Sequence, residues 1–331
     1  MDLPDLEIVT IFFFHPGGIC ARMRVLPRGE KRTKVEEAMA KADVLIEALP
    51  YIQDFKGSVV VIKVGGSIME SAENLERLLT DIAFMSAVGI RIVLVHGGGK
   101  AISRGLKAAG IVSTFVQGLR VTTEEAIHVV EHVIKDEVNA NVVQLLRKHG
   151  ANAHSLHGDW LFRVEKKTGR DPETGAVLDW GYVGRPTDVD VRPVMEMLNA
   201  GLVPAVTPLG VGPDGKLYNV NADTAAAAIA KAMKVRKLAF ISDVPGLLMR
   251  VVDPSSLLAT LRIGSVEKLE KEGIIGGGML PKLDSCVEAI RAGVGKVHLI
   301  DGRMPHSLLL EIFTKKGVGT EIIADENERN Y

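Results

Sequence analysis

The sequence contains very little cysteine, since Cys20 and Cys286 are the two cysteines among 331 residues. Two distant cysteines provide neither a disulfide framework nor the ligand spacing of a zinc site, and they are typical of a reducing compartment. Long apolar runs are also lacking, because no stretch reaches the ~18–20 residues that a transmembrane helix needs. We therefore expect a cytoplasmic protein with no membrane partner.

Neither sign of charge dominates the composition. Forty lysines and arginines stand against forty-one aspartates and glutamates, which leaves a net charge of −1. Proteins that bind nucleic acids usually carry a basic excess, so nothing here indicates a nucleic-acid partner. Hydrophobic residues make up 47% and charged residues 24%, the balance of a globular chain long enough for two lobes.

The first 33 residues differ from the rest of the chain. Leu6 to Phe14 is apolar, but acidic residues stand where a signal peptide would carry positive charge. We expect residues 1–33 to be a disordered leader, or to precede a native start at Met23.

Strand-like and helix-like apolar patterns alternate along the chain. Residues 59–64 form a continuous β-branched run, typical of a strand buried on both faces. Further strands are expected at residues 91–95, 203–207, 238–242 and 296–300, and helices at 34–49, 99–109, 224–233, 282–292 and 306–313. This alternation predicts an α/β fold with a mostly parallel central sheet sandwiched by helices.

Residues 160–186 depart from this alternation. Polar and apolar residues alternate around the turn-rich segment 171–175, which predicts a long hairpin. A hairpin near the strand ends would be either a lid over a substrate or a solvated surface feature, and the spacing favours neither.

Two lysines stand beside glycine clusters in distant parts of the chain. Lys63 ends an expected strand and precedes Gly65 and Gly66, while Lys282 closely follows the cluster 276–278. Glycine lets backbone N–H groups approach an anion, and lysine supplies a mobile charge that neutralises a transferring phosphoryl group. Because ligands bind at the carboxyl ends of strands in open α/β sheets, we favour a phosphoryl-transfer site over a pair of surface lysines.

A third glycine cluster, residues 97–99, follows His96 at the end of another expected strand. Such a string forms an anion-binding turn, but it also occurs in the oxyanion holes of hydrolases. A hydrolase is disfavoured because the chain has no Gly-x-Ser-x-Gly elbow. Neither this cluster nor that beside Lys282 has the spacing of a Walker loop or of a dinucleotide fingerprint, so another type of phosphate site is expected.

Polar residues precede two of the expected helices. Asn219, Asn221 and Asp223 occupy alternate positions, either as a plain N-cap or, with the two lysines, as a carboxylate that orients cationic groups. Arg120 stands just before a helix that begins with a capping box at residues 122–125. Arginine suits bidentate capture of a carboxylate, although the spacing alone leaves a structural role equally open.

Together these segments resemble the amino-acid kinase family. The resemblance runs from about residue 34 to the C-terminus, and it depends on the order of six strings. They are Lys63 to Gly66, His96 to Gly99, Gly118 to Thr122, Asn219 to Asp223, Ser242 to Gly246 and Gly277 to Lys282. The string at 118–122 favours the branch that acts on N-acetyl-L-glutamate in arginine biosynthesis over those that act on carbamate, aspartate or uridylate.

The resemblance implies that ATP with Mg²⁺ phosphorylates the side-chain carboxylate of N-acetyl-L-glutamate, the metal being carried by ATP. Residues 56–210 would form the lobe that binds the acyl-amino acid, and residues 211–325 the lobe that binds ATP. The implied catalytic residues are Lys63, Lys282 and Asp223. The implied substrate contacts are Gly98, Gly99, Arg120, Asn219 and Asn221. The implied nucleotide or phosphate contacts are Gly65, Gly66, Asp243, Val244, Pro245, Gly246, Leu247, Leu248, Gly276, Gly277, Gly278 and Met279.

The resemblance also extends to regulation. The helix of residues 34–50 is similar to one that joins dimers into a hexameric ring in arginine-inhibited family members. We therefore expect a homo-oligomer, a dimer or a hexamer, that arginine inhibits through His306, Glu311 and Gly317. The alternative is an ordinary amphipathic helix docked on its own domain.

Some residues depart from the family pattern, namely Lys100, Ser67 and Ile68, and the long segment 160–186. They leave open a kinase for a related carboxylate, such as carrier-protein-linked aminoadipate or glutamate. A non-catalytic arginine-sensing homologue is the alternative from another class, but it would have no need of the two lysines and Asp223 together. A dinucleotide-dependent oxidoreductase is less favoured than either alternative, because the chain lacks the dinucleotide fingerprint.

Overall fold

A computed structural model describes residues 6–15, 18–27, 34–171, 174–250, 253–275, 279–314 and 317–325. The chain divides into two compact units, residues 1–50 and 51–331. Among the described residues, no helix is both long enough and apolar enough to cross a membrane.

The first unit contains an antiparallel pair of strands, β1 (Leu6–His15) and β2 (Gly18–Pro27). This run is rich in β-branched and aromatic residues, which favour strands. A disordered leader over residues 1–33 stays an expectation. A native start at Met23 stays a prediction.

Helix α1 (Lys34–Phe55) is longer than predicted, since it continues through Pro50 instead of ending there. A proline inside a helix removes one backbone hydrogen bond. Burial offsets this loss, because the side chain of Phe55 is only 5% exposed and belongs to the core of the second unit.

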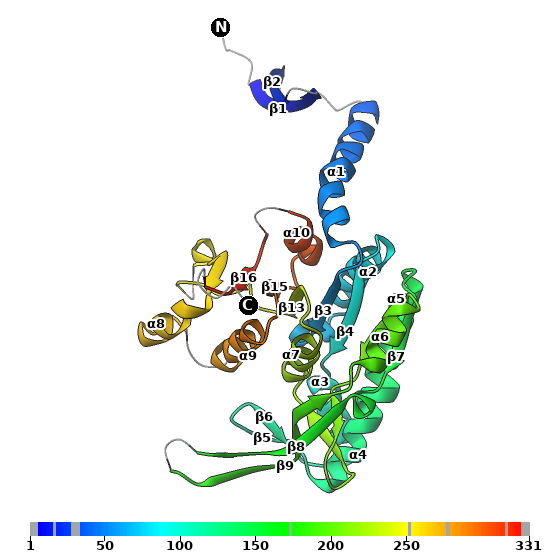
Figure 1. Cartoon of the computed structure of the whole chain (residues 1–331), viewed down its shortest axis with the longest axis vertical. Helices are drawn as coiled ribbons and strands as arrows, with labels where there is room; N and C mark the ends of the chain where they lie inside the picture. Colours follow the sequence, from blue (N-terminus) through cyan, green and yellow to red (C-terminus); the bar gives the residue numbers. More distant parts are fainter. Residues whose placement is uncertain are drawn as a thin grey trace. The chain divides into compact units, whose positions relative to one another are not determined.

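An eight-stranded sheet forms the centre of the second unit (Figure 1). All neighbouring strands run parallel except β15 and β16, so the predicted α/β fold with a mostly parallel sheet is confirmed. In spatial order the strands are β14 (Thr260–Arg262), β16 (Thr320–Ile323), β15 (Lys296–Asp301), β13 (Lys237–Ser242), β3 (Val59–Val64), β4 (Arg91–His96), β10 (Val203–Val206) and β7 (Ala153–Leu156).

Helices cover both faces of this sheet. One face packs against α2 (Ala72–Ala87), α5 (Ala140–Lys148) and α10 (Ser307–Phe313). The other face packs against α6 (Arg192–Asn199), α7 (Ala222–Met233) and α9 (Leu280–Arg291).

The alternation of side chains along β3 decides which face Lys63 joins. Ile62 and Val64 belong to the core beneath α2 and α5, whereas Val61 belongs to the core beneath α7 and α9. Successive side chains of a strand point to opposite faces. Lys63 therefore lies on the same face as Val61 and points toward α7.

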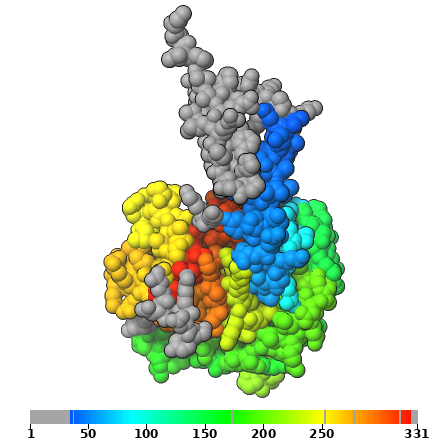
Figure 2. Space-filling view, turned by 45° about the horizontal axis from the view of Figure 1, so that its top comes forward, coloured from blue at the N-terminus to red at the C-terminus, as the bar shows by residue number. Residues whose placement is uncertain are grey.

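The predicted lobes share this one sheet. Strands from residues 56–210 form one half and strands from residues 211–325 the other, and β3 and β13 pair where the halves meet. Figure 2 shows the yellow-to-red C-terminal segments gathered on the left and the green middle segments on the right and below. The lobe boundary itself falls inside the second unit and stays a prediction.

The predicted hairpin at residues 160–186 is confirmed. Strands β8 (Phe162–Arg170) and β9 (Val177–Val189) pair antiparallel and extend away from the central sheet (Figure 1). They form a small closed barrel with β11 (Leu209–Val211) and β12 (Leu217–Val220). A separate hairpin joins β5 (Thr114–Val116) and β6 (Leu119–Val121).

The other helices connect these sheets. They are α3 (Gly99–Ala108), α4 (Glu124–His132), the π-helix η2 (Val133–Asn139), α8 (Val266–Lys271), and the short 3₁₀ turns η1 (Gly66–Met69), η3 (Gly158–Trp160), η4 (Pro254–Ser256) and η5 (Ile263–Ser265). The predicted helix start is observed one residue later. The N-cap is Thr123, whose side chain accepts a hydrogen bond from the backbone N–H of Ala126, and alanine at this third helical position replaces the glutamate that a capping box requires.

Candidate active site

Lys63 and Lys282 converge on one carboxylate, that of Asp223. The Nζ atom of Lys63 lies 2.7 Å from Oδ1 of Asp223, and Nζ of Lys282 lies 2.9 Å from Oδ2. The three side chains come from β3, from the first turn of α9 and from the first turn of α7. The structure therefore brings together the three residues that the sequence analysis named as catalytic.

The electrostatics of this cluster favour an anion. Burial alone would raise the pKa of Asp223, but the charges of Lys63 and Lys282 outweigh burial and hold that pKa below its ordinary value. The carboxylate is thus ionised, and two ammonium groups face one negative charge. The surplus positive charge lies among largely buried side chains, where an anionic phosphoryl group would complete it.

Glycine loops line a cavity of about 220 Å³ beside this cluster. Lys63, Asp223 and the glycines at 65–66 and 97–99 contribute to its wall. A Cβ atom at Gly65 would lie 2.2 Å from Nζ of Lys63, so only glycine leaves the lysine its position. The first and third glycine clusters therefore line the same cavity.

Arg120 lies in the wall of the same cavity with its guanidinium largely buried. Its Nη2 atom donates to the carbonyl oxygen of Gly99 at 2.7 Å and to the hydroxyl of Ser103 at 2.8 Å. Its Nη1 atom donates to the hydroxyl of Ser113. Its Cζ atom lies 4.6 Å from the centre of the Phe115 ring. Burial lowers its pKa.

Within the described part of the chain, all hydrogen-bond partners of Arg120 are neutral oxygens. A buried guanidinium without a carboxylate partner is costly unless a ligand supplies the negative charge. The geometry therefore suits the capture of a carboxylate.

The polar segment before α7 divides between two roles. The side chain of Asn221 accepts a hydrogen bond from the backbone N–H of Thr224, so Asn221 is the N-cap of α7. Asn219 belongs to β12, and both asparagines line the cavity. The plain N-cap interpretation thus applies to Asn221. Asp223 lies inside the helix and forms ion pairs with Lys63 and Lys282.

The expected nucleotide contacts follow the end of β13. Asp243 accepts a long hydrogen bond of 3.4 Å from the backbone N–H of Ser67, next to the glycine pair at 65–66. Leu247 is buried, and its N–H donates to the hydroxyl of Thr320. Met279 precedes α9. Contacts of residues 243–248 and 279 with a nucleotide stay predictions, and Gly276, Gly277 and Gly278 lie outside the described residues.

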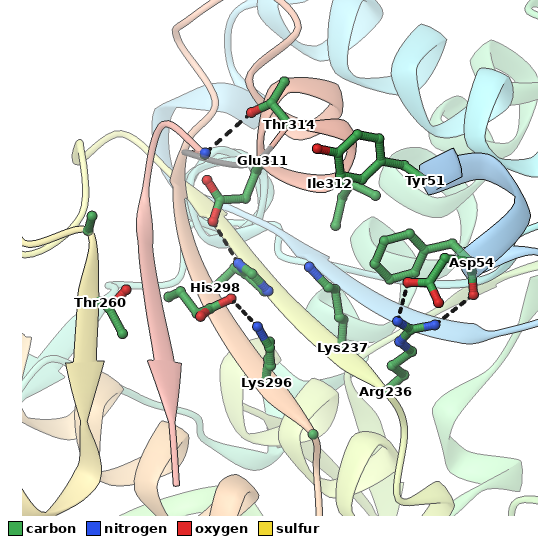
Figure 3. A pocket seen from close by; sticks show the side chains of 15 residues that line it. Tyr51, Asp54, Arg236, Lys237, Thr260, Lys296, His298, Glu311, Ile312 and Thr314 are labelled. Carbon is green, nitrogen blue, oxygen red and sulfur yellow. Dashed lines mark hydrogen bonds and ion pairs between the residues drawn. The ribbon is translucent and has the colours of Figure 1, made fainter. Parts of the chain in front are cut away.

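A second pocket, of about 480 Å³, lies at the opposite end of β13 and β15 (Figure 3). Glu311 and Gly317 line it, as the sequence analysis predicted for a regulatory site. His306 is not among its lining residues. Instead, Nδ1 of His306 lies 2.7 Å from Oδ1 of Asp81, because the turn before α10 directs the imidazole toward α2.

The histidine of this pocket is His298, which the sequence analysis missed. Its Nδ1 atom lies 2.7 Å from Oε1 of Glu311, and both side chains are nearly fully buried. The other Glu311 oxygen accepts hydrogen bonds from the N–H groups of Val318 and Gly319. A polar residue in the middle of the apolar strand 296–300 was the signal that would have identified it.

The pKa values in this pocket have clear physical causes. Burial would raise the pKa of Glu311, but the hydrogen bond from His298 and the two backbone N–H groups lower it, so the carboxylate is ionised. Burial lowers the pKa of His298, which therefore donates as a neutral imidazole. Burial also lowers the pKa of Lys237 to about 8.

Two cationic side chains in the pocket wall form ion pairs with acidic ones. Arg236 pairs with Asp54, and Lys296 pairs with Glu321 at 2.8 Å. In Figure 3, Lys237 points into the pocket between His298 and Asp54. Its Nζ atom lies 4.9 Å from the centre of the Phe55 ring.

Comparison with known proteins assigns the class. Residues 58–301 match the amino acid kinase family, and the chain belongs to that family. An acetylglutamate kinase of Heliobacterium modesticaldum is 45% identical over 292 residues, which cover 87% of this chain and 99% of that protein. The chain is thus a kinase with the fold of this family.

Two solved structures of one enzyme share the fold. N-acetylglutamate synthase from Neisseria gonorrhoeae complexed with coenzyme A and N-acetyl-glutamate superposes with a TM-score of 0.74 at 27% identity. This alignment covers 86% of this chain and 63% of the other. The same synthase complexed with coenzyme A and L-arginine gives a TM-score of 0.70 at 25% identity, covering 85% and 65% of the two chains.

Proposed function

We propose that the protein transfers the γ-phosphoryl group of ATP to the side-chain carboxylate of N-acetyl-L-glutamate. One carboxylate oxygen bonds to phosphorus, the bond from that phosphorus to the bridging oxygen breaks, and ADP leaves. The product is an acyl phosphate. The observation that carries this proposal is the convergence of Lys63 and Lys282 on Asp223 beside a cavity that also contains Arg120.

The attacking carboxylate is already ionised near neutral pH, so the reaction needs no general base. Catalysis then depends on holding two anions together and neutralising the charge that they share. The ammonium groups of Lys63 and Lys282 supply that charge, and Asp223 holds both in place. Mg²⁺ carried by ATP would add charge on the phosphates.

Arg120 and the neighbouring polar groups would orient the acceptor. Its guanidinium is buried and bonded to neutral oxygens, so the α-carboxylate of the substrate would provide its missing counter-charge. Asn219 lies in the same cavity wall and offers an amide to the acceptor. Gly98 caps α3, and backbone N–H groups at a helix N-terminus suit an anion. The similarity to a curated acetylglutamate kinase supports this choice of acceptor.

The test is an assay with ATP in which hydroxylamine traps the acyl phosphate as a hydroxamate. We expect the hydroxamate with N-acetyl-L-glutamate and much less with N-acetyl-L-aspartate, whose carboxylate is one methylene nearer the backbone. Product only with carrier-protein-linked aminoadipate or glutamate would assign the alternative acceptor. No product with any of these acceptors would leave the non-catalytic arginine sensor.

We further propose that arginine inhibits the enzyme by binding in the second pocket. Its volume of about 480 Å³ accommodates an amino acid. The ionised Glu311 would attract the guanidinium, and Lys237 would attract the carboxylate. His298 would take the role that the sequence analysis gave to His306. That a related synthase was solved with L-arginine supports the proposal.

A titration with L-arginine tests the regulatory proposal, with D-arginine and L-citrulline as matched ligands. L-Citrulline lacks the positive charge, so it should inhibit far less. Glu311→Gln should weaken inhibition while leaving turnover without arginine intact, because Glu311 lies outside the catalytic cavity. Unchanged activity across the L-arginine titration would contradict the proposal.

Helix α1 is proposed to join two copies of the chain. Val35, Met39, Val44, Leu45 and Ile46 are each more than 60% exposed, so a large apolar area of this helix faces solvent. Such an area is typical of a protein interface. Ile46→Glu should lower the oligomeric mass measured by light scattering, whereas an unchanged mass would leave the helix without this role.

A further inference from the structure

The helical segment that begins at Glu124 contains a π-helix at its centre. Segment η2 (Val133–Asn139) separates α4 from α5. Hydrogen bonds in a π-helix span five residues, and single π turns often occur at functional sites. In an α-helix, residues five apart would point about 140° away from one another. The wider turn instead brings Ile134 and Asn139 toward the same loop.

Asn139 reaches the end of β4 through His96. Its Nδ2 atom donates to Nε2 of His96 at 2.9 Å and to the carbonyl oxygen of Ala205 at 2.8 Å. Nδ1 of His96 in turn lies 2.9 Å from the carbonyl oxygen of Gly97. Asn139 and His96 are 0% exposed, so these contacts are sealed from water.

These contacts determine the tautomer of His96. A carbonyl oxygen accepts only, so Nδ1 must carry the proton that bonds to Gly97, and Nε2 must accept from Asn139. Burial lowers the pKa of His96 to about 4, which agrees with a neutral ring. The amide of Asn139 cannot be reversed, because its carbonyl oxygen would then face the acceptor oxygen of Ala205.

Asn139, His96 and the carbonyl of Gly97 form a hydrogen-bonded relay. The loop of residues 97–99, which this relay reaches, lines the catalytic cavity. Gly97 is held at both its peptide groups, since its N–H donates to the carbonyl oxygen of Val64 at 2.7 Å and its carbonyl accepts from His96. In a planar trans peptide, the carbonyl and the following N–H point in opposite directions. The N–H of Gly98 is therefore directed away from His96. Side-chain alternation along β4 and β3 places His96 on the α5 face and Lys63 on the α7 face.

Side chains of the π-helix also pack directly against Gly98 in this loop. A Cβ atom at Gly98 would lie 2.5 Å from Cδ1 of Ile134 and 3.6 Å from Cγ2 of Val138. The same helical turn thus contacts Gly98 directly and positions Gly97 through Asn139 and His96.

We propose that Asn139 is a positioning residue that acts through His96 to aim the backbone N–H of Gly98 at the acceptor or the transferred phosphoryl group. This assignment rests on the proposed function of the cavity. It goes beyond the residues that touch substrate, because Asn139 and His96 are absent from the cavity wall. Its consequence is that turnover depends on the tautomer of a histidine that takes no proton in the reaction.

The first test reads the tautomer without any assay. In ¹⁵N-histidine NMR spectra of the full-length protein, His96 should show a protonated Nδ1 and an accepting Nε2 between pH 6 and 8. His96→Gln identifies its signals among those of the nine histidines. Asn139→Asp places a carboxylate against Nε2, which should raise the pKa of His96 and make the ring titrate. A protonated Nε2 in the neutral ring of the unaltered protein would overturn the proposal.

The second test measures turnover in the same variant. At pH 8, Asn139→Asp should lower kcat by about 10-fold to 100-fold, the scale of a 1 Å misplacement at a reacting group. The loss should diminish toward pH 6, where an imidazolium can again bond to both neighbours. KM for ATP should stay within about twofold. Asn199→Asp is a matched change in an exposed contact with Arg91. It should leave kcat, the pH dependence of kcat and KM for ATP unaltered.

The remaining outcomes are decisive as well. A kcat within twofold of the unaltered enzyme at every pH would overturn the proposal. So would parallel losses of kcat, ATP binding and folded fraction, because they would show a structural role only. If the unaltered protein phosphorylates none of the acceptors, the proposed function fails, and the NMR test still decides whether the relay exists.

Discussion

Nζ of Lys63 and Oδ1 of Asp223 form an ion pair at 2.7 Å. Lys63 lies near the C-terminal end of a central strand, and Asp223 lies in the first turn of a helix from the other half of the chain. Lys282 approaches the second oxygen of the same carboxylate. Asp223 therefore separates two ammonium groups that would otherwise repel one another, and Lys63 and Asp223 line one cavity. Under the proposed function, this cluster would let a chain without a Walker loop neutralise a phosphoryl group.

Lys63→Ala or Lys282→Ala should each lower kcat by about 10²–10³-fold, the scale for losing one preorganised charge-stabilising group. The hydroxamate assay measures this loss. Lys231→Ala is the matched control, because Lys231 pairs with Glu288 on the exposed sides of α7 and α9. Near-normal turnover in either test variant would refute the role given to that lysine.

Asp223→Asn should lower kcat by a comparable factor while conserving the size of the side chain. The neutral amide no longer offsets the repulsion between the two ammonium groups, so both lysines should move apart. A variant as active as the unaltered enzyme would show that the lysines keep their positions without the carboxylate. Binding of ADP by calorimetry is the control for an intact fold.

Arg120→Lys should raise KM for N-acetyl-L-glutamate by about 10-fold or more and leave KM for ATP nearly constant. An ammonium cannot reproduce the planar, bidentate geometry of a guanidinium. It would also lose the packing over the Phe115 ring. Steady-state kinetics in both substrates separate these effects, and equal changes in the two KM values would argue against a carboxylate site.

Lys237→Met should raise the free energy of unfolding at pH 7. The folded protein holds the pKa of this lysine at about 8, below the ordinary lysine pKa of 10.5. Between these values the unfolded chain binds more protons, so stability should rise with pH in that window. Urea unfolding from pH 7 to pH 10 checks the sign, and in Lys237→Met this part of the rise should disappear.

Leu79→Ala should lower the free energy of unfolding by about 2–5 kcal/mol, the usual cost of emptying a buried leucine site. Leu79 is 0% exposed beneath the sheet face that carries no catalytic lysine. Urea unfolding measures the loss, and kcat well below the melting temperature should be unaffected. Leu310→Ala, at a side chain that is 38% exposed, should cost far less.

Much of the fold could be predicted because local patterns repeat with the period of each element. The β-branched run at 59–64 became β3, and the threonine pair at 122–123 marked the start of α4 to within one residue. Pro50 misled the prediction of α1, since the burial of Phe55 in a distant core outweighs one missing hydrogen bond.

The chain order alone was enough to indicate the glycine loops, both lysines and Asp223, because each stands at the end of a strand or the start of a helix. Only the tertiary structure decided which groups meet. It brought Lys63 to Asp223 across the junction of the two half-sheets, selected His298 instead of His306 for the second pocket, and joined Asn139 to His96. These contacts depend on which face of a strand or helix is buried, and that is settled by packing between segments far apart in the chain.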